Sequence, residues 1–256
     1  MGKSSVKNLT FGSPMKLILG FLLPLLGGLL FQQLYNMVDT LVVGRYLGVN
    51  ALAGVGSTGS INFLVLGFCI GICNGFVIPV AQKFGEGDED GLRKYVANGF
   101  WLSAVFAVVI TICVCFLCST ILHWMDTPSE IFKEAYNYIF VIFLGIPVTI
   151  LYNLLSGIIR SLGDSKTPIY FLILSSLLNV LFDILSVRLL NMGVSGPAWA
   201  TVLSQAISGI LCLIVMFRRY PVLRLTCDDL KPRKAYLLRL FSMGVPMGLQ
   251  YSITAI

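Results

Sequence analysis

Long runs of apolar residues, separated by short polar connections, extend along almost the whole chain. A bilayer core of about 30 Å needs roughly 20 predominantly apolar helical residues to cross it. Six runs are that long, and they cover residues 17–43, 51–82, 95–122, 135–159, 167–187 and 189–217. A seventh apolar run, residues 240–256, reaches the last residue of the sequence. The pattern predicts an all-α polytopic membrane bundle of six transmembrane helices and a truncated seventh.

The composition favours a membrane protein over a soluble domain. Of the 256 residues, 57% are hydrophobic and only 12% are charged, and the mean hydropathy is +0.87. About a quarter of the residues of a soluble domain are charged. The seven cysteines lie almost entirely within the apolar runs, so the sequence does not indicate a disulfide framework.

Lysine and arginine are distributed unequally between the two sides that the predicted spans define. Fifteen lie on the side of the N-terminus, seven of them in residues 218–239, and only Arg45, Lys133 and Arg188 lie on the other side. Because positively charged connections stay in the cytoplasm, we expect a multi-pass protein of a bacterial plasma membrane with a cytoplasmic N-terminus. The net charge of +6 is then mostly a signal of orientation and does not indicate a nucleic-acid partner. The basic residues on the cytoplasmic side would lie beside anionic lipid headgroups.

The longest polar connection, residues 218–239, is the natural boundary in the chain. It separates an N-terminal six-helix lobe (1–217) from the start of a second, truncated lobe (240–256), and we expect it to be a basic cytoplasmic connection. The segment "LILGFLLP" at 17–24 aligns with "RLFSMGVP" at 239–246, and both continue to a glutamine. Internal repeats are common in transporters, so we expect the chain to be part of a longer protein.

Two carboxylates lie inside predicted spans, whereas the other acidic residues lie in connections or at span edges. Asp39 is in the first span and Asp183 is in the fifth. An ionised carboxylate near the middle of a membrane helix costs roughly 2.5–3.5 kcal/mol on insertion scales, which indicates either a function or a permanent ion pair. Arg45 and Arg188 are the candidate partners for such a pair, because no lysine or arginine lies within the apolar stretch of any span.

Both carboxylates belong to polar stripes that follow one helix face. At 3.6 residues per turn, one stripe contains Gln32, Tyr35, Asn36 and Asp39, and the other contains Asn179 and Asp183. A polar stripe that faced lipid would be left without hydrogen-bond partners, so both should face the bundle interior or a watered cavity. A carboxylate removed from water takes up a proton more readily, and carboxylate, amide and hydroxyl oxygens suit a hard cation. We therefore expect an exchangeable cation, H⁺ or Na⁺.

Five segments together resemble the multidrug and toxic compound extrusion (MATE) transporters, within the larger group that includes polysaccharide-lipid flippases. They are "FQQLYNMVDTLVVGRYLG" (31–48), "IPVAQKFGEGD" (78–88), "SGIIRSLGDSKTP" (156–168), "NVLFD" (179–183) and "GVSGPAWATVLSQ" (193–205). They occur in the family's order along the whole chain. The resemblance implies half of a twelve-helix, two-lobe transporter with a V-shaped cavity, whose partner is a C-terminal lobe of the same protein.

The resemblance also assigns roles to individual residues. It implies a cation site, possible for Na⁺, formed by Asp39, Asn179, Asp183 and Thr201. A fourth-helix tyrosine beside this site corresponds to Tyr138, with Tyr136 close by as the alternative. Gln32, Tyr35, Asn36 and Asn153 are candidate residues for lining a substrate cavity, and Pro24 is a candidate for bending the first helix.

The function that follows is a secondary active antiporter that exports organic, cationic compounds in exchange for sodium or protons. A lipid-linked oligosaccharide flippase is one alternative, although it calls for a more cationic cavity than spans without arginine provide. A channel is another, because it too tolerates carboxylates in the membrane. We find no metal-ligand cluster, nucleophile–base pair or phosphate-binding loop, so we expect neither an enzyme nor a cofactor beyond the coupling ion.

Overall fold

The computed structural model describes residues 14–226 and 228–254. Within these ranges the chain forms nine α-helices and one short 3-10 helix, and no strand. Four residues of the sequence analysis lie outside the described ranges. They are Lys3 and Lys7, which were counted among the fifteen basic residues, Cys227, which was counted among the seven cysteines, and Ile256, which ends the last apolar run.

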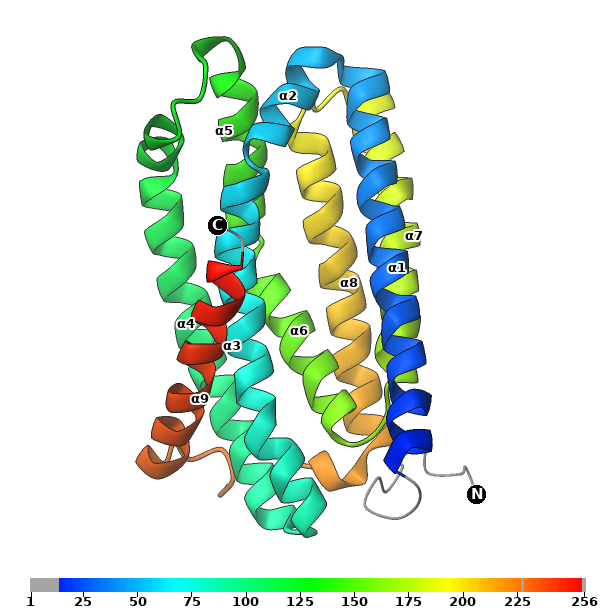
Figure 1. The fold of residues 1–256 in the computed structure, drawn as a ribbon, viewed down its shortest axis with the longest axis vertical. Coiled ribbons are helices and arrows are strands. Elements are labelled where there is room, and N and C mark those ends of the chain that lie inside the picture. The colour runs from blue at the N-terminus through cyan, green and yellow to red at the C-terminus, as the bar shows by residue number, and fades with distance from the viewer. Residues whose placement is uncertain (1–13, 227, 255–256) are drawn as a thin grey trace.

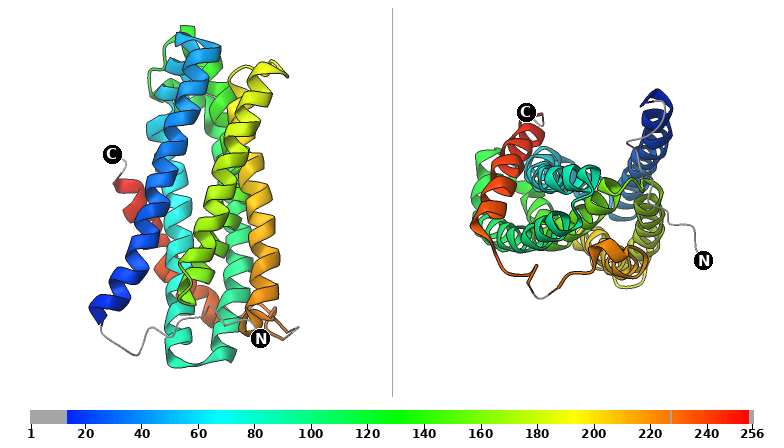
Figure 2. Two further views of the ribbon diagram at one scale, coloured as in Figure 1. Left: turned by 90° about the vertical axis from the view of Figure 1, so that its right-hand side faces the viewer. Right: turned by 90° about the horizontal axis from the view of Figure 1, so that it is seen from below.

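Most of the helices run up and down along one long axis (Figure 1). In chain order they are α1 (Pro14–Leu47), α2 (Val49–Ser57), α3 (Gly59–Glu86), α4 (Glu89–Trp124), α5 (Ser129–Leu144), α6 (Ile146–Ser161), α7 (Lys166–Arg188), α8 (Ser195–Arg219), the 3-10 helix η1 (Pro221–Leu223) and α9 (Lys234–Ile253). Seen from below, the lower part of α1 stands away from α9 and α3 (Figure 2).

The predicted class, an all-α membrane bundle, is confirmed. Five of the described helices, α1, α3, α4, α7 and α8, are long and apolar enough to cross a bilayer. The pair α5 and α6 makes a sixth candidate span with a bend of 47° between its halves. The seventh apolar run begins its helix earlier than predicted, because α9 starts at Lys234.

Two predicted spans are broken, and a third begins later than predicted. The run 51–82 is broken at Thr58 into α2 and α3, within a segment rich in glycine and serine. The run 135–159 is broken at Gly145, where α6 starts with Pro147 in its first turn; proline lacks the N–H that would continue α5. The sixth helix begins at Ser195 and not at 189, because Asn191 and Gly193 adopt left-handed backbone conformations that interrupt the helix.

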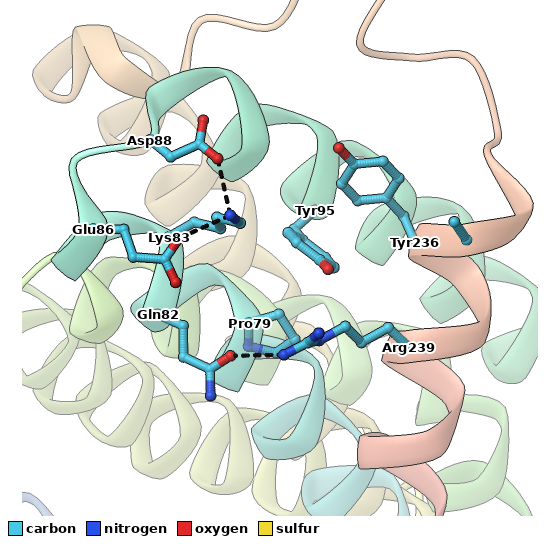
Figure 3. Close-up of a pocket in the computed structure, with 9 residues that line it drawn as sticks. Pro79, Gln82, Lys83, Glu86, Asp88, Tyr95, Tyr236 and Arg239 are labelled. Atoms are coloured by element: carbon cyan, nitrogen blue, oxygen red, sulfur yellow. Dashed lines mark hydrogen bonds and ion pairs between the residues drawn. The ribbon is translucent and has the colours of Figure 1, made fainter.

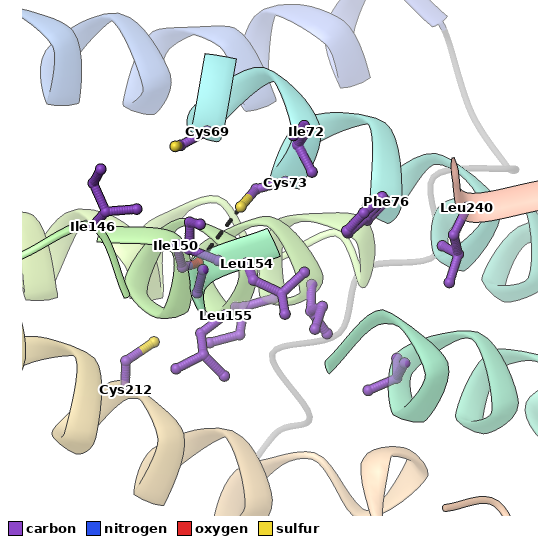
Figure 4. Packing of buried hydrophobic residues seen from close by; sticks show 14 of the residues in the cluster. Cys69, Ile72, Cys73, Phe76, Ile146, Ile150, Leu154, Leu155, Cys212 and Leu240 are labelled. Carbon is purple, nitrogen blue, oxygen red and sulfur yellow. Dashed lines mark hydrogen bonds between the residues drawn. The ribbon is translucent and has the colours of Figure 1, made fainter. Parts of the chain in front are cut away.

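The bundle is organised around α3, which packs against α4, α6 and α9. Its buried side chains include Cys73 and Phe76, which meet Ile150 and Leu154 of α6 (Figure 4). The thiol of Cys73 donates to the carbonyl oxygen of Ile150 at 3.5 Å. In lipid the hydrophobic effect does not draw helices together, so close packing of this kind provides the cohesion.

Candidate functional site

A cavity of about 890 Å³ lies between α1 and the helices that face it. Its wall includes residues of α3, α5, α6, α7 and α8 and one residue of α9. The α1 face is the predicted polar stripe, and Gln32, Tyr35, Asn36 and Asp39 all line the cavity. Helix α1 is continuous through Pro24, and the stripe follows that proline.

Asp39 and Asp183 lie next to each other at one end of this cavity. Asp183 is fully buried on α7, and its carboxyl group interacts directly with that of Asp39 on α1. Both oxygens of Asp183 and Oδ1 of Asp39 are buried without a hydrogen-bond partner. Among the described residues, neither Arg45 nor Arg188 forms an ion pair with these carboxyl groups. The predicted alternative of a permanent ion pair is therefore not what the described chain contains.

Asn179 and Thr201 complete the polar cluster around the two carboxylates. The amide Nδ2 of Asn179 donates to the hydroxyl of Thr201 at 3.1 Å, and that hydroxyl donates to the carbonyl oxygen of Pro197 at 3.1 Å. This arrangement leaves the amide Oδ1 of Asn179 buried without a donor. Four buried oxygens from three side chains thus lack a hydrogen-bond donor, which is an arrangement that fits a small hard cation or a proton.

The tyrosines around the cluster differ in their positions. Tyr35 and Tyr138 lie within electrostatic range of both Asp39 and Asp183, and both line the cavity. Tyr136 instead stacks on Phe140 of its own helix, with ring centroids 5.5 Å apart. Of the two tyrosines considered from the sequence, Tyr138 is the one that the structure brings to the carboxylates.

The middle of the cavity contains amide and hydroxyl groups that are largely tied to the backbone or to each other. Asn153 lines the cavity as predicted, and its Nδ2 donates to the carbonyl oxygen of Thr149 at 2.8 Å. The hydroxyl of Thr149 donates to Oε1 of Gln205 at 2.9 Å, which links α6 to α8. Sequence reasoning missed Thr149 and Gln205, although each has a polar neighbour four residues away on its own helix, Asn153 and Thr201 respectively.

Arg160 is the main correction to the predicted site. The sequence interpretation placed it in the connection between the fourth and fifth spans and described the spans as free of arginine. In the structure α6 continues to Ser161, so Arg160 lies in the last helical turn and lines the cavity. A cavity without any arginine, which counted against a flippase, was therefore a wrong expectation.

A second pocket, of about 470 Å³, lies between the ends of α3, α4 and α9 (Figure 3). Its charged groups are already paired, since Lys83 contacts Glu86 at 2.8 Å and Asp88 at 3.0 Å. Arg239 donates to Oε1 of Gln82 at 3.4 Å. Of the unsatisfied carboxylates, Asp39 lines the larger cavity and Asp183 is buried beside it, and neither lines this pocket. No group of three or more His, Cys, Asp or Glu side chains suited to a metal occurs within the described ranges.

Comparison with known proteins gives one family. The MatE family matches residues 24–185 of this chain. The probable multidrug resistance protein YoeA of Bacillus subtilis is 31% identical over 245 residues, which cover 92% of this chain and 52% of that protein. The chain thus spans about half the length of the curated relatives it matches.

Solved structures agree with this result. A MOP superfamily transporter from Pyrococcus furiosus, for which a reversed polarity of the binding pocket suggests a different function, has a TM-score of 0.89 and 26% identity. The outward-facing conformation of a multidrug resistance MATE family transporter also has a TM-score of 0.89 and 26% identity. Each match covers 98% of this chain and 55% of the solved chain, as expected for one lobe of a two-lobe transporter.

Proposed function

Because this chain belongs to the MatE family, whose members are transporters and not enzymes, we propose that it forms the N-terminal lobe of a secondary active antiporter. The antiporter exports organic compounds, cationic ones in the first place, in exchange for sodium or protons. The chain works in a bacterial plasma membrane with its N-terminus in the cytoplasm and together with a C-terminal lobe of the same protein.

One observation carries the proposal. The adjacent carboxyl groups of Asp39 and Asp183, together with Oδ1 of Asn179, present buried oxygens that no donor satisfies. Two neighbouring carboxylates disfavour simultaneous ionisation, so the lobe gains stability when a proton or a sodium ion binds between them. Thr201 takes the NH₂ group of Asn179 as its donor, which leaves the amide oxygen of Asn179 buried and available to a cation.

The cluster couples the cation to transport through the position of α1. Asp39 belongs to α1 and Asp183 to α7, so neutralising the pair changes the force between these two helices. Helix α1 also provides Gln32 and Asn36 to the cavity wall. A cation that binds from outside therefore changes the cavity that holds the organic compound, with Pro24 as the site where α1 can bend. The cation and the compound then favour different states, as exchange requires.

A lipid-linked oligosaccharide flippase of the same superfamily is the second candidate, and Arg160 is the observation that favours it. A phosphate-containing lipid needs cationic groups in the cavity, and Arg160 provides one. A single arginine is a weak counterpart for such a substrate, which keeps the antiporter first.

The test uses the complete natural protein in proteoliposomes, with a sodium gradient and a proton gradient imposed separately. We expect efflux of an organic cation to respond to at least one gradient and to be lost in Asp39→Asn and Asp183→Asn. Asp126→Asn, at an exposed residue of the α4–α5 connection, is the control and should transport normally. Efflux that ignores both gradients, or that survives in both variants, contradicts coupling through this pair.

A further inference from the structure

The end of the cavity opposite the carboxylates contains a guanidinium group without a counter-ion. Arg160 and Asp39 are the charged residues among those that line the cavity. Within the described ranges, the guanidinium group of Arg160 forms neither an ion pair within 4.0 Å nor a hydrogen bond. Arg160 is half-buried, and its electrostatic neighbours are Tyr152, Tyr251 and Cys73, none of which is a carboxylate.

The coupling carboxylates are too far away to be that counter-ion. Tyr152, a neighbour of Arg160, donates to the carbonyl oxygen of Pro168 near the start of α7. Asp183 follows Pro168 by 15 residues on the same helix, which corresponds to about 22 Å at 1.5 Å per residue. The cavity is therefore dipolar, with the carboxylates at one end and the guanidinium at the other.

Asp164, the acidic residue nearest to Arg160 in the sequence, already accepts hydrogen bonds from other groups at both of its carboxylate oxygens. Its Oδ1 accepts from the backbone N–H groups of Lys166 at 2.9 Å and Thr167 at 3.0 Å. Its Oδ2 accepts from the hydroxyls of Thr167 and Tyr220, each at 2.7 Å. These bonds hold Asp164 in the turn between α6 and α7, so its charge stabilises that turn and does not bind Arg160.

The surroundings of Arg160 are suited to an amphiphile. Apolar residues of α1 and α7 line the same cavity, among them Leu25, Leu26, Ile169 and Leu172. An arginine removed from water needs an anionic or hydrogen-bonding partner, and its planar fork of donors matches a carboxylate, sulfonate or phosphate. Ser165 lies on the same part of the wall and offers a hydroxyl for a third oxygen.

We propose that Arg160 is the centre of an anion subsite, which binds the carboxylate, sulfonate or phosphate of an amphiphilic organic molecule whose apolar part lies along α1 and α7. Compounds that carry both charges then fit the dipolar cavity better than compounds that carry a cation alone. Export of the bound molecule rests on the proposed function. Binding of that molecule at Arg160 does not rest on it.

The experiment measures equilibrium binding to the complete natural protein in nanodiscs of phosphatidylcholine, without any ion gradient. The probes are 1-anilinonaphthalene-8-sulfonate and N-phenyl-1-naphthylamine, which share one aromatic skeleton and differ in the sulfonate. We expect Arg160→Gln to weaken binding of the sulfonate probe about tenfold, as for loss of a charge-assisted contact, and to leave the neutral probe unchanged. Arg218→Gln, at an exposed arginine of α8 outside the cavity, should affect neither probe.

Retained binding of the neutral probe shows that the variant cavity is folded. If Arg160→Gln does not fold, Arg160→Lys replaces it and should weaken the sulfonate probe less, because the charge remains and the fork is lost. Equal affinity of wild type and variant for the sulfonate probe, or an equal loss for both probes, overturns the proposal. Since no gradient is applied, a failure of cation coupling leaves this result unaffected.

A second arm distinguishes a lipid headgroup from a free organic anion as the source of the anionic group. Phosphatidylglycerol is added to the nanodiscs in increasing proportion. If an anionic lipid occupies the subsite, the sulfonate probe is displaced from wild type and not from Arg160→Gln. If free anions occupy it, wild type keeps its advantage over the variant at every lipid composition. Both results require the subsite.

Discussion

At the scale of single residues, a substitution of Asp183 distinguishes a role of its carboxyl group in transport from a role in stabilising the fold. Its carboxyl group is fully buried beside Asp39, and neither of its oxygens has a donor. Two adjacent carboxyl groups removed from water disfavour simultaneous ionisation, so a neutral amide in place of one of them removes this repulsion. We therefore expect Asp183→Asn to raise the unfolding temperature in sodium-free buffer while it abolishes transport. A scan that follows labelling of the buried thiols of Cys69 and Cys73 measures this.

The control for that scan is Asp126→Asn, because Asp126 is exposed and asparagine tolerates its positive φ of 49°. Its unfolding temperature should equal that of wild type. A lower unfolding temperature in Asp183→Asn would mean that the carboxylate stabilises the fold, and the cation-site assignment would lose its main support.

The hydroxyl of Thr201 provides a second prediction at this scale. It accepts from Nδ2 of Asn179 and donates to the carbonyl oxygen of Pro197, and so holds the amide of Asn179 in one orientation. Thr201→Val keeps the shape and removes the hydroxyl, which typically loses about 1 kcal/mol. We expect the concentration of the coupling cation at half-maximal efflux to rise roughly fivefold. Thr201→Ser restores the oxygen and should stay near wild type, whereas equal behaviour of the two variants would exclude this role.

The hydrogen bonds of Asp164, in the connection between α6 and α7, predict that the free energy of unfolding depends on pH. Partial burial would raise its pKa, but the hydrogen bonds from Tyr220 and Thr167 outweigh burial and lower the pKa below the usual 3.8. A carboxyl whose pKa is lower in the folded protein stabilises it above pH 3.8 and loses that contribution as pH falls through the folded pKa.

The corresponding variant is Asp164→Asn. At pH 7 we expect it to lower the free energy of unfolding by about 1–3 kcal/mol, as for hydrogen bonds to a charged group. Below about pH 4 the difference from wild type should shrink, because the wild-type carboxylate is then protonated as well. Denaturation in urea at several pH values measures this, and a difference that is constant with pH would contradict the assignment.

The candidate site was partly readable from the sequence, for a geometric reason. Residues three and four apart share a helix face, so Gln32, Tyr35, Asn36 and Asp39 had to point one way wherever α1 was placed. The position of Arg160 was not readable, because it depends on where α6 ends. Helix α6 ends only two residues beyond the predicted run, which is enough to move Arg160 from a polar connection into the cavity wall, and hydropathy does not resolve so small a difference.

At the scale of helices, the contact between α3 and α9 depends on glycines from both partners. A Cβ atom on Gly75 would lie 2.5 Å from the Cα of Gly244 and 2.6 Å from the carbonyl oxygen of Met243. A Cβ on Gly71 would meet the carbonyl oxygen of Met247 at 2.5 Å. All of these neighbours are backbone atoms, which cannot rotate away, so the two helices pack at a distance that only glycine permits.

We expect Gly75→Val to separate α3 from α9 and to lower the unfolding temperature, with earlier labelling of Cys73, one turn or less away on α3. Gly85→Ala is the matched control, since a Cβ there meets nothing within 4 Å. In a helix this change should stabilise by up to about 1 kcal/mol. If Gly75→Val labels and unfolds like wild type, α9 does not rest on α3 in solution.

The spans themselves were predictable because hydropathy averages over about 20 residues, and all six runs contain helix. The breaks at Thr58 and Gly145 were not located, because a break depends on one or two residues within an average that stays apolar. Pro147 lies just after the break at Gly145. Whether such a proline bends a helix or ends it depends on the packing of its neighbours, which the sequence does not contain.

At the scale of the whole molecule, the basic connection is a docked segment and not only a tether. The indole Nε1 of Trp101 on α4 donates to the carbonyl oxygen of Leu230 at 2.9 Å, and the backbone N–H of Arg233 donates to Oδ1 of Asn98 at 2.9 Å. Arg93 of α4 contacts Asp229 at 3.5 Å. These contacts fix the connection on α4 just before α9 begins. The sequence around Trp101 does not indicate this contact, because its partner lies 129 residues away in the chain.

This docking predicts resistance to trypsin at the basic residues of the connection, such as Arg233 and Lys234. Trp101→Phe keeps an aromatic ring and removes the N–H, which should lose about 1 kcal/mol and raise the population of the undocked state roughly fivefold. When reclosing is faster than cleavage, the cleavage rate follows that population, so we expect a similar increase in the appearance of fragments cut in this segment. Trp124→Phe, at an exposed tryptophan far from the connection in the sequence, should be cut at the wild-type rate. Equal cleavage of Trp101→Phe and wild type would mean that the connection is already free of α4, and the start of α9 would then need another anchor.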